Sequence, residues 1–387
     1  MLYLNKNRTR LTPMKQGELE YEYYDTSARP PFAVYRELVN GWIANLPERD
    51  RDEIIARFRS KSISYGATLS ELMLHEAILG QGFATELHPQ GSHPSNRLDF
   101  KVFGPGGKVV ALVEATSIAL AKETIAHNNR EARIYNAVDA IELPAGWRLS
   151  YRLQVAGLDS PPTGPLRRDI KQWAQEVAAS NDASTLHKRI FIAGDWEIEL
   201  TLLGGFDPES DDRRAIAGAM GQIRLLEPHY KIRHALELKG DKYGALDAPY
   251  LIVIADCRDE LPGNEHNAIS LLEAVFGTES VKFVLQANGE TVTREERLHD
   301  GYWGIEGAAK NANVSAVMLL PKPNLWHLRD ERHQPIIVHN PWATHPWPRD
   351  VFPLPSFNID EAGSISLTSG KSFADLIGLP EEWPPEG

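Results

Sequence analysis

The sequence predicts an α/β fold, with an α+β arrangement as the alternative. Two apolar runs rich in β-branched residues, Val109–Val113 and Tyr250–Ala255, are typical of buried strands. Segments with apolar residues at helical spacing lie between such runs, and strands and helices are mixed along the whole chain. A chain of 387 residues, 42% of them hydrophobic, is long enough for one large domain or two.

The elements expected from the pattern follow in chain order. Residues 1–30 resemble an extended arm, and residues 31–61 resemble two helices that break at Pro47. A helix capped by Thr68 or Ser70 should end at Gly80 and Gly82. The other expected elements are the hairpin 98–116, helices 118–140, 165–180, 220–238 and 264–276, and strands 147–155, 189–193, 196–203, 250–255 and 314–320. We therefore expect an N-terminal arm and helical cover at 1–61, a core at 62–205, and a C-terminal α/β region at 206–387.

The hairpin 98–116 carries two acidic residues, Asp99 and Glu114. The segment Gly104-Pro-Gly-Gly107 supplies its turn. With a turn axis near residues 105 and 106, Asp99 lies opposite Leu112 and shares one face with Leu112, Glu114 and Thr116. Because Glu114 follows an apolar run, we expect its carboxylate to be buried and to need a partner.

Two carboxylates at neighbouring positions of one sheet face repel each other unless a cation lies between them. Oxygen ligands of this kind suit Mg²⁺ or Mn²⁺, so Asp99 and Glu114 are candidate metal ligands. The alternative is structural. In that interpretation Asp99 is a solvated hairpin residue, and Glu114 is an edge-strand charge or the partner of an arginine.

The order helix, hairpin, helix with these acids resembles the PD-(D/E)XK, or restriction-endonuclease-like, superfamily over residues 62–155. In that superfamily a helix glutamate precedes a Gly-aromatic pair by about eleven residues, an aspartate opens the next hairpin, and a Glu-x-Lys follows. Here Glu71 lies eleven residues before Gly82-Phe83, Asp99 takes the aspartate position, and Glu114-Ala-Thr116 takes the last. The resemblance implies an α-β-β-β-α-β core with an N-terminal helical cover and a C-terminal α/β extension.

The resemblance also implies roles for these residues. Asp99, Glu114 and the carbonyl of Ala115 would hold the metal, which activates a water and neutralises charge on the scissile phosphate. Glu71 would orient the site or bind a second ion, with Glu76 as the alternative. Thr116 would position the water.

Thr116 departs from the superfamily pattern, because it stands where the superfamily has a lysine. A threonine hydroxyl can form hydrogen bonds but carries no charge. Two lysines are candidates to supply that charge: Lys101, on the Asp99 face of a regular strand, and Lys122, which opens the following helix. Both could equally be ordinary surface lysines.

The helix after the hairpin borders the substrate groove in the superfamily architecture. Arg130 and Arg133 lie on this helix, so they are candidate phosphate contacts. The alternative is that they form part of an ordinary polar helix face.

A second resemblance spans most of the chain, to bacterial proteins of no known activity. It rests on Ser70–Glu76, on the hairpin Asp99–Thr116, on Val314–Val317 and on His339–Ala343. In this bacterial branch Glu-Ala-Thr replaces Glu-x-Lys, which favours a retained function.

Charge limits the expected partners. Forty-one basic and 53 acidic residues give a net charge of −12, which argues against broad attraction to nucleic acid or to an anionic membrane. Residues 213–242 carry seven Lys or Arg against three acidic residues. We interpret this segment as a solvated helix face with ion pairs, with a local basic groove as the alternative.

Cysteine usage and the N-terminal sequence predict a soluble cytoplasmic protein. The chain has one cysteine, so an intramolecular disulfide is excluded. The first eight residues have no apolar signal core, and no apolar run approaches the length of a membrane span.

The segment after residue 325 is rich in His, Pro and Trp. The spacing of its histidines matches no usual zinc motif, so we interpret them as surface or packing residues. Its tryptophans could stack on nucleobases, but we favour a role in holding the tail against the body. These residues are His327, His333, His339, His345, Trp326, Trp342 and Trp347.

The sequence therefore predicts a metal-dependent nuclease that hydrolyses phosphodiester bonds in DNA, with RNA as the alternative substrate. The competing hypothesis is a nuclease-fold protein without catalysis that binds nucleic acid or another protein. The sequence leaves the oligomeric state open, with a homodimer as the candidate.

Overall fold

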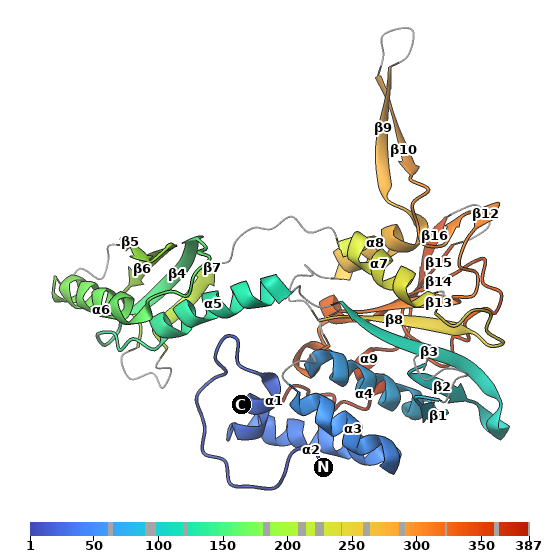
Figure 1. The fold of residues 1–387 in the computed structure, drawn as a ribbon, viewed down its shortest axis with the longest axis horizontal. Coiled ribbons are helices and arrows are strands. Elements are labelled where there is room, and N and C mark those ends of the chain that lie inside the picture. Colours follow the sequence, from blue (N-terminus) through green and yellow to red (C-terminus); the bar gives the residue numbers. More distant parts are fainter. Residues whose placement is uncertain are drawn as a thin grey trace. The chain divides into compact units, whose positions relative to one another are not determined.

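The computed structural model describes residues 1–60, 65–89, 98–118, 122–180, 186–207, 214–220, 228–240, 242–257, 264–285, 291–321, 323–359 and 364–385. The chain forms two compact units (Figure 1). Both have mixed α/β structure, which confirms the predicted fold class. Unit 1 comprises residues 1–11, 19–119 and 226–387, and unit 2 comprises residues 12–18 and 120–225. This division differs from the predicted boundaries at 61/62 and 205/206, because unit 2 is an insertion between two neighbouring strands of unit 1.

Unit 1 is built around an eight-stranded mixed sheet of order β1-β2-β3-β8-β13-β14-β15-β16. β1 to β3 form an antiparallel meander, β3 pairs in parallel with β8, and β8 pairs in parallel with β13. The strands are β1 Ala84–Leu87, β2 Phe100–Phe103, β3 Val109–Ile118, β8 Tyr250–Asp256, β13 Ala316–Pro321, β14 Ile336–His339, β15 Ser356–Ile359 and β16 Ile365–Thr368.

Helices cover both faces of this sheet (Figure 1). α4 (Tyr65–Gly80) packs on β3 and β8 from one side, with α9 (Phe373–Leu376) against it. α7 (Pro228–Gly240) packs on the same strands from the other side, and α8 (Asn264–Phe276) packs beside it on β13 and β14. The sheet therefore lies between two helical layers, which explains why β8 and β13 are buried at every residue.

The N-terminal helices are α1 Glu20–Thr26, α2 Pro30–Asn45 and α3 Glu48–Arg59, with the predicted break at Pro47. Two short additions complete unit 1: the hairpin of β9 (Glu279–Leu285) and β10 (Thr291–Arg297), and the pair β11 (Gly304–Ile305) with β12 (Ala308–Ala309).

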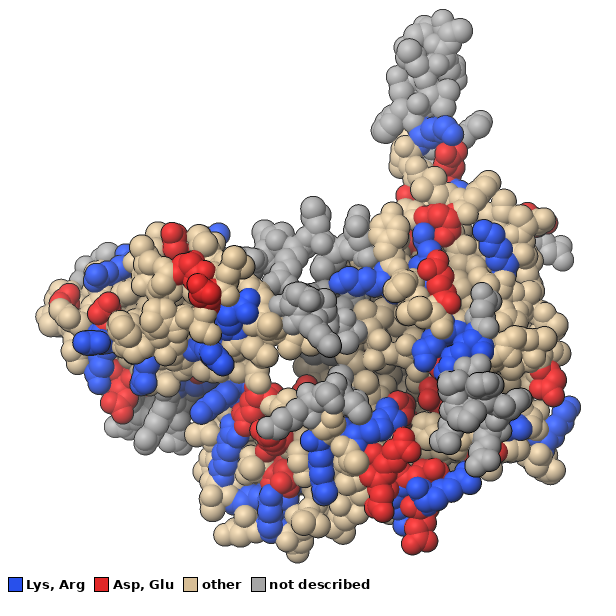
Figure 2. All heavy atoms as spheres, viewed as in Figure 1, with Lys and Arg blue, Asp and Glu red and all other residues tan. Residues whose placement is uncertain are grey.

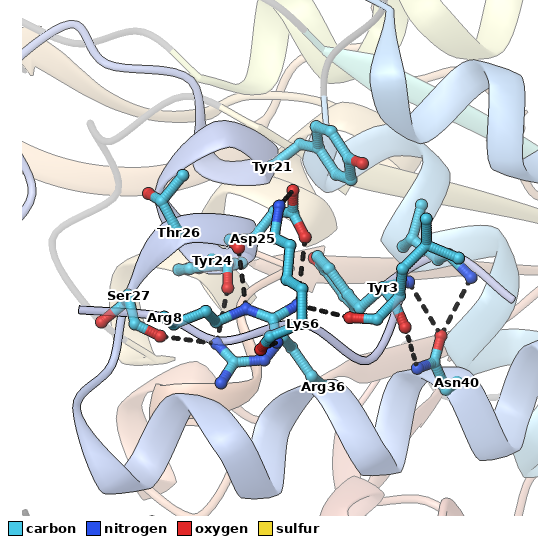
Figure 3. Close-up of polar contacts among 12 residues, drawn as sticks. Tyr3, Lys6, Arg8, Tyr21, Tyr24, Asp25, Thr26, Ser27, Arg36 and Asn40 are labelled. Atoms are coloured by element: carbon cyan, nitrogen blue, oxygen red, sulfur yellow. Dashed lines mark hydrogen bonds and ion pairs between the residues drawn. The ribbon is translucent and has the colours of Figure 1, made fainter. Parts of the chain in front are cut away.

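The arm predicted at residues 1–30 is not extended throughout, since Glu20–Thr26 form α1, and its first residues are pinned to α1 and α2 (Figure 3). The side-chain oxygen of Asn40 accepts hydrogen bonds from the backbone N–H groups of Leu2 and Tyr3, at 2.9 and 3.0 Å. The Asn40 amide donates back to the Tyr3 carbonyl. Lys6 and Arg8 both pair with Asp25, so this segment is a fixed part of unit 1.

Unit 2 is a two-layer α/β structure. Its sheet has the order β5-β6-β4-β7, and α5 and α6 contribute side chains to one core with it. The elements are α5 Lys122–Asp139, β4 Arg148–Val155, α6 Thr163–Ala179, β5 His187–Ala193, β6 Trp196–Leu203 and β7 Ile216–Met220. The strand predicted at 147–155 is confirmed, but it lies in this second sheet and not in the sheet that carries Glu114.

Two local predictions are wrong. Thr68 and Ser70 lie inside α4, and Ser70 donates back to the carbonyl of Ala67, so neither caps the helix. The helix predicted from Met220 begins at Pro228, since Met220 ends β7, and residues 221–227 lie outside the described residues. Among the described residues, no helix has the length and apolarity to cross a bilayer.

Candidate functional site

The hairpin predicted to carry the two acids exists as β2 and β3. Its register pairs Lys101 with Leu112 and Phe100 with Val113, so the predicted pairing of Asp99 with Leu112 is wrong by two residues. Continued by one residue, this register places Asp99 opposite Glu114. A shift of two residues preserves side-chain parity, so Asp99 and Glu114 still belong to one face.

Asp99 lies in the bend just before β2, where its carboxylate caps the backbone of the neighbouring strand. Its Oδ2 accepts a 2.6 Å hydrogen bond from the backbone N–H of Ala115. Its Oδ1 lies 3.8 Å from Nδ1 of His88, a residue with a positive φ of 45°. The Asp99 side chain is 17% exposed, so one oxygen is anchored while the group keeps access to solvent.

Burial raises the pKa of the Asp99 carboxyl well above its usual range, and the nearby carboxylates of Glu114 and Glu71 raise this pKa further. The bond from Ala115 and the ammonium of Lys239 oppose that rise. Three carboxylates therefore share one electrostatic environment. Perturbed carboxyl groups of this kind occur at functional sites and also in structural ion-pair networks.

Glu114 is the most buried of these acids, at 1% exposure, in the middle of β3. Its Oε1 accepts from Nζ of Lys239 at 2.6 Å and from Nζ of Lys242 at 3.2 Å. Its Oε2 accepts from the hydroxyl of Tyr243 at 2.5 Å. The carboxylate is thus held by two ammonium groups and one phenol, which meets the expectation that it needs partners.

Both lysines come from the end of α7 and the turn after it. α7 packs on the Glu114 side of the sheet because Ile232 and Leu236 join the same core as Leu112 and Ile252. This packing brings the last turn of the helix to Glu114. Lys239 and Lys242 remain 26% and 23% exposed, so each ammonium reaches the buried carboxylate while it stays in contact with solvent.

Tyr243 completes the cluster. It also accepts a 2.7 Å hydrogen bond from Nζ of Lys242. Burial raises the pKa of Tyr243, and its hydrogen bond to Glu114 raises it further. The phenol therefore stays protonated at neutral pH and donates to Glu114.

Glu71 lies on α4, where it forms a bidentate ion pair with Arg57 of α3. Glu76, the predicted alternative, accepts from Asn45 at 2.8 Å and contacts the ring of His75. Glu71, and not Glu76, is among the carboxylates that raise the pKa of Asp99.

The lysine candidates from the sequence differ from those in the structure. The ammonium of Lys101 lies 6.0 Å from the centroid of the Phe103 ring, toward the turn of the hairpin. Lys122 opens α5 in unit 2, and its side chain lies outside the described residues. Thr116 is half-buried on β3, two residues beyond Glu114 and therefore on the same face.

Arg130 and Arg133 lie on α5 in unit 2, whereas Asp99 and Glu114 belong to unit 1. Arg133 donates to the Ser160 hydroxyl at 3.3 Å, and the Nε atom of Arg130 is buried with no hydrogen-bond partner among the described residues. Their contact with nucleic acid remains a prediction. On the face that Figure 2 shows, the Lys and Arg side chains of the described residues are interspersed with Asp and Glu.

The donor set of Asp99, Glu114 and the Ala115 carbonyl fits a hard divalent cation in kind, because all three are oxygen ligands. Two facts limit that fit. Both Glu114 oxygens already accept hydrogen bonds, and the described residues include no group of three or more His, Cys, Asp or Glu side chains arranged for a metal. An ion at this site would therefore compete with Lys239 and Lys242 for Glu114.

Sequence reasoning missed Lys239 and Lys242, which it assigned to a solvated helix face. Two signals were present: a glutamate in a buried strand that needed cations, and a basic segment in an acidic chain. The sequence did not reveal that residues 120–225, which lie between Glu114 and Lys239, belong to a separate unit. Comparison with protein-family models, with curated proteins and with solved structures gives no match.

Proposed function

We propose that this protein is a metal-dependent nuclease with a restriction-endonuclease-like core, and that it hydrolyses phosphodiester bonds in DNA. The observation that carries the proposal is the contact of Lys239 and Lys242 with Glu114, close to Asp99. These lysines supply the positive charge that Thr116, in the usual lysine position, lacks. The choice of DNA over RNA rests on the superfamily resemblance.

The order of elements supports the same proposal. With unit 2 set aside as an insertion, unit 1 follows the order α4, β1, β2, β3, α7, β8, which is the α-β-β-β-α-β order of that core. The pairing β1-β2-β3-β8, antiparallel up to β3 and then parallel, places both acids on central strands or beside them.

In this proposal Asp99, Glu114 and the Ala115 carbonyl would hold Mg²⁺ or Mn²⁺. The bound ion would lower the pKa of a water and neutralise charge on the phosphate. Tyr243 fixes the orientation of the Glu114 carboxylate, and Arg57 holds Glu71 on the neighbouring helix. Lys239 would stabilise negative charge that develops on the phosphate oxygens, and Thr116 would position the attacking water.

A second candidate function is a nucleic-acid-binding or protein-binding module without catalysis. It is favoured by the full pairing of Glu114, since a carboxylate neutralised by two lysines needs no metal. In that case the cluster is a structural polar network.

Cleavage assays separate the two candidates. Supercoiled DNA, linear DNA and single-stranded RNA are incubated with the protein in Mg²⁺, in Mn²⁺ and in EDTA. We expect metal-dependent cleavage of DNA that Asp99→Asn abolishes and that Lys310→Met, the matched control at an exposed position outside the cluster, leaves unchanged. Binding without cleavage in either metal, or cleavage that Asp99→Asn leaves intact, overturns the proposed site.

A further inference from the structure

A cavity of about 330 Å³ lies at the opposite end of the sheet from β1, around β14, β15 and β16. Three strands, β8, β13 and β14, separate β15 from the strand that carries Glu114. The cavity is lined by His339, Arg349, Phe352, Pro353, Leu354, Ser356, Thr368, Ser369, Gly370 and Lys371. Its size lies near the lower end of the range for small-molecule sites, roughly 300–1,000 Å³.

Among the described residues, the lining combines two cations with no carboxylate, in a chain whose net charge is −12. Arg349 and Lys371 supply the positive charge. Ser356, Thr368 and Ser369 supply hydroxyl groups, which can donate hydrogen bonds to anionic oxygens. A cavity with this lining attracts an anion.

The cationic groups are held in place by neighbours that leave donors free. Arg349 donates through one terminal nitrogen to Oδ1 of Asn358 at 2.6 Å, and Asn358 in turn donates to the Thr368 hydroxyl at 3.2 Å. A guanidinium has five N–H donors, so several remain for a ligand. Because Thr368 accepts from Asn358, its own O–H is available to the cavity. Nζ of Lys371 donates to Gln81 at 3.3 Å and keeps two further N–H donors.

The wall of the cavity depends on a close backbone approach. A Cβ atom at Gly370 would lie 2.2 Å from the carbonyl carbon of Leu354, so a larger residue does not fit there. The backbone N–H of Lys371 donates to the Pro353 carbonyl at 2.7 Å. This contact places Lys371 beside the apolar wall of Phe352, Pro353 and Leu354, which suits the organic part of a ligand.

His339 contributes an uncharged ring. Burial and the positive charge of Arg349 together lower the pKa of His339 to about 4, with burial as the larger cause. At neutral pH the ring is therefore a neutral donor and acceptor beside the guanidinium.

We propose that this cavity is a binding site for a phosphate monoester. A monoester carries a charge of about −1.5 to −2 at pH 7, which matches the two cations of the lining better than the single charge of a diester does. The phosphate would contact Arg349, Lys371 and Thr368, and the esterified group would lie against Phe352 and Leu354. The proposal does not depend on the proposed nuclease activity.

Calorimetric titration in EDTA tests the site with inorganic phosphate, a nucleoside 5′-monophosphate and the matching nucleoside. We expect the monophosphate to bind and the nucleoside to bind at least tenfold more weakly or not at all. Arg349→Gln and Lys371→Gln should each weaken the monophosphate at least tenfold, and Lys310→Gln, at an exposed position outside the cavity, should leave binding unchanged. Arg349→Lys keeps the charge and should give an intermediate loss of monophosphate affinity. Such a graded loss distinguishes a lost contact from an unfolded variant.

Competition by a 5′-phosphorylated oligonucleotide, compared with its 5′-hydroxyl form, shows whether the monoester belongs to a strand end or to a free small molecule. Displacement by the phosphorylated form alone indicates a strand end, and displacement by neither form indicates a free molecule. Equal binding of nucleoside and monophosphate overturns the proposal, as does the absence of monophosphate binding at millimolar concentration, or unchanged binding in both Arg349→Gln and Lys371→Gln.

Discussion

Lys239 of α7 donates a 2.6 Å hydrogen bond to Oε1 of Glu114 in β3, across a sequence separation of 125 residues. This contact places a cation at the acid pair, two residues along β3 from Thr116, which stands where the proposed superfamily has a lysine. Lys239 can therefore stabilise the fold, take part in the chemistry, or do both, and measurements of stability and of cleavage test the two roles separately.

Removal of Lys239 should reduce stability. Lys239→Met leaves the buried Glu114 with Lys242 and Tyr243, so we expect a loss of roughly 1.5–3 kcal/mol in the free energy of unfolding. Chemical denaturation measures it. In a double-mutant cycle with Glu114→Gln, the two losses should be clearly non-additive. Additive losses would mean that the two side chains do not interact in solution.

Asp99→Asn should stabilise the protein at neutral pH but not at low pH. Asp99 binds its proton more tightly in the folded chain than in the unfolded one, so the free energy of unfolding falls as pH rises from about 3.9 through the raised native pKa. Asparagine removes this penalty and still accepts the bond from Ala115. We expect a gain in the free energy of unfolding at pH 7 and no gain below pH 3.

Thermal melts of both proteins across this pH range check the prediction. Wild type and Asp99→Asn should have melting temperatures that converge at low pH and separate as pH rises. If Asp99→Asn is less stable than wild type at pH 7, the folded protein stabilises the ionised Asp99 carboxylate, and the pKa of Asp99 is not raised.

Thr116→Lys should rescue the loss of Lys239. Thr116 lies on the same face of β3 as Glu114, two residues away, so a lysine there can direct an ammonium to the same carboxylates. We expect the double variant Thr116→Lys/Lys239→Met to recover at least tenfold of the cleavage rate lost in Lys239→Met. Thr116→Val/Lys239→Met is the matched control, and equal rates in the two double variants contradict the charge-replacement argument.

Asn40→Ala should release the N-terminal segment. The Asn40 side chain accepts from the N–H groups of Leu2 and Tyr3 and donates to the Tyr3 carbonyl (Figure 3). Loss of these bonds from a buried segment should cost about 2–3 kcal/mol. Hydrogen exchange should show lost protection at residues 2 and 3 and no change in β8; unchanged protection at both residues would contradict the pinned arrangement.

The sequence predicted most local elements because their signals are local. The break at Pro47, the end of α4 at Gly80 and the buried run of β8 all depend on residue type and spacing. The register of the hairpin was wrong by two residues for two reasons. Next to the turn Phe103 pairs with Val109 and not with Lys108, and an irregularity after Val102 shifts the pairing by one further residue. Neither feature leaves a mark in the residue pattern.

The site was predicted in part for the same reason. Asp99 and Glu114 belong to one hairpin, so a local pattern was enough to find them. Lys239 is far from Glu114 in the sequence because unit 2 is inserted between β3 and α7. It reaches Glu114 because Ile232 and Leu236 of α7 pack on the sheet. Long-range pairing of this kind depends on the whole fold and not on the spacing of residues.

The rate of DNA cleavage by Lys239→Met under single-turnover conditions in Mg²⁺ tests the central claim most directly. If the ammonium beside Glu114 stabilises the charge that develops on the phosphate, the rate should fall about 10²–10³-fold below that of the wild type. DNA binding and the folded state, measured in the same preparation, should be retained. A Lys239→Met protein that cleaves at the wild-type rate, or a wild-type protein that binds DNA without cleaving it, would contradict the account.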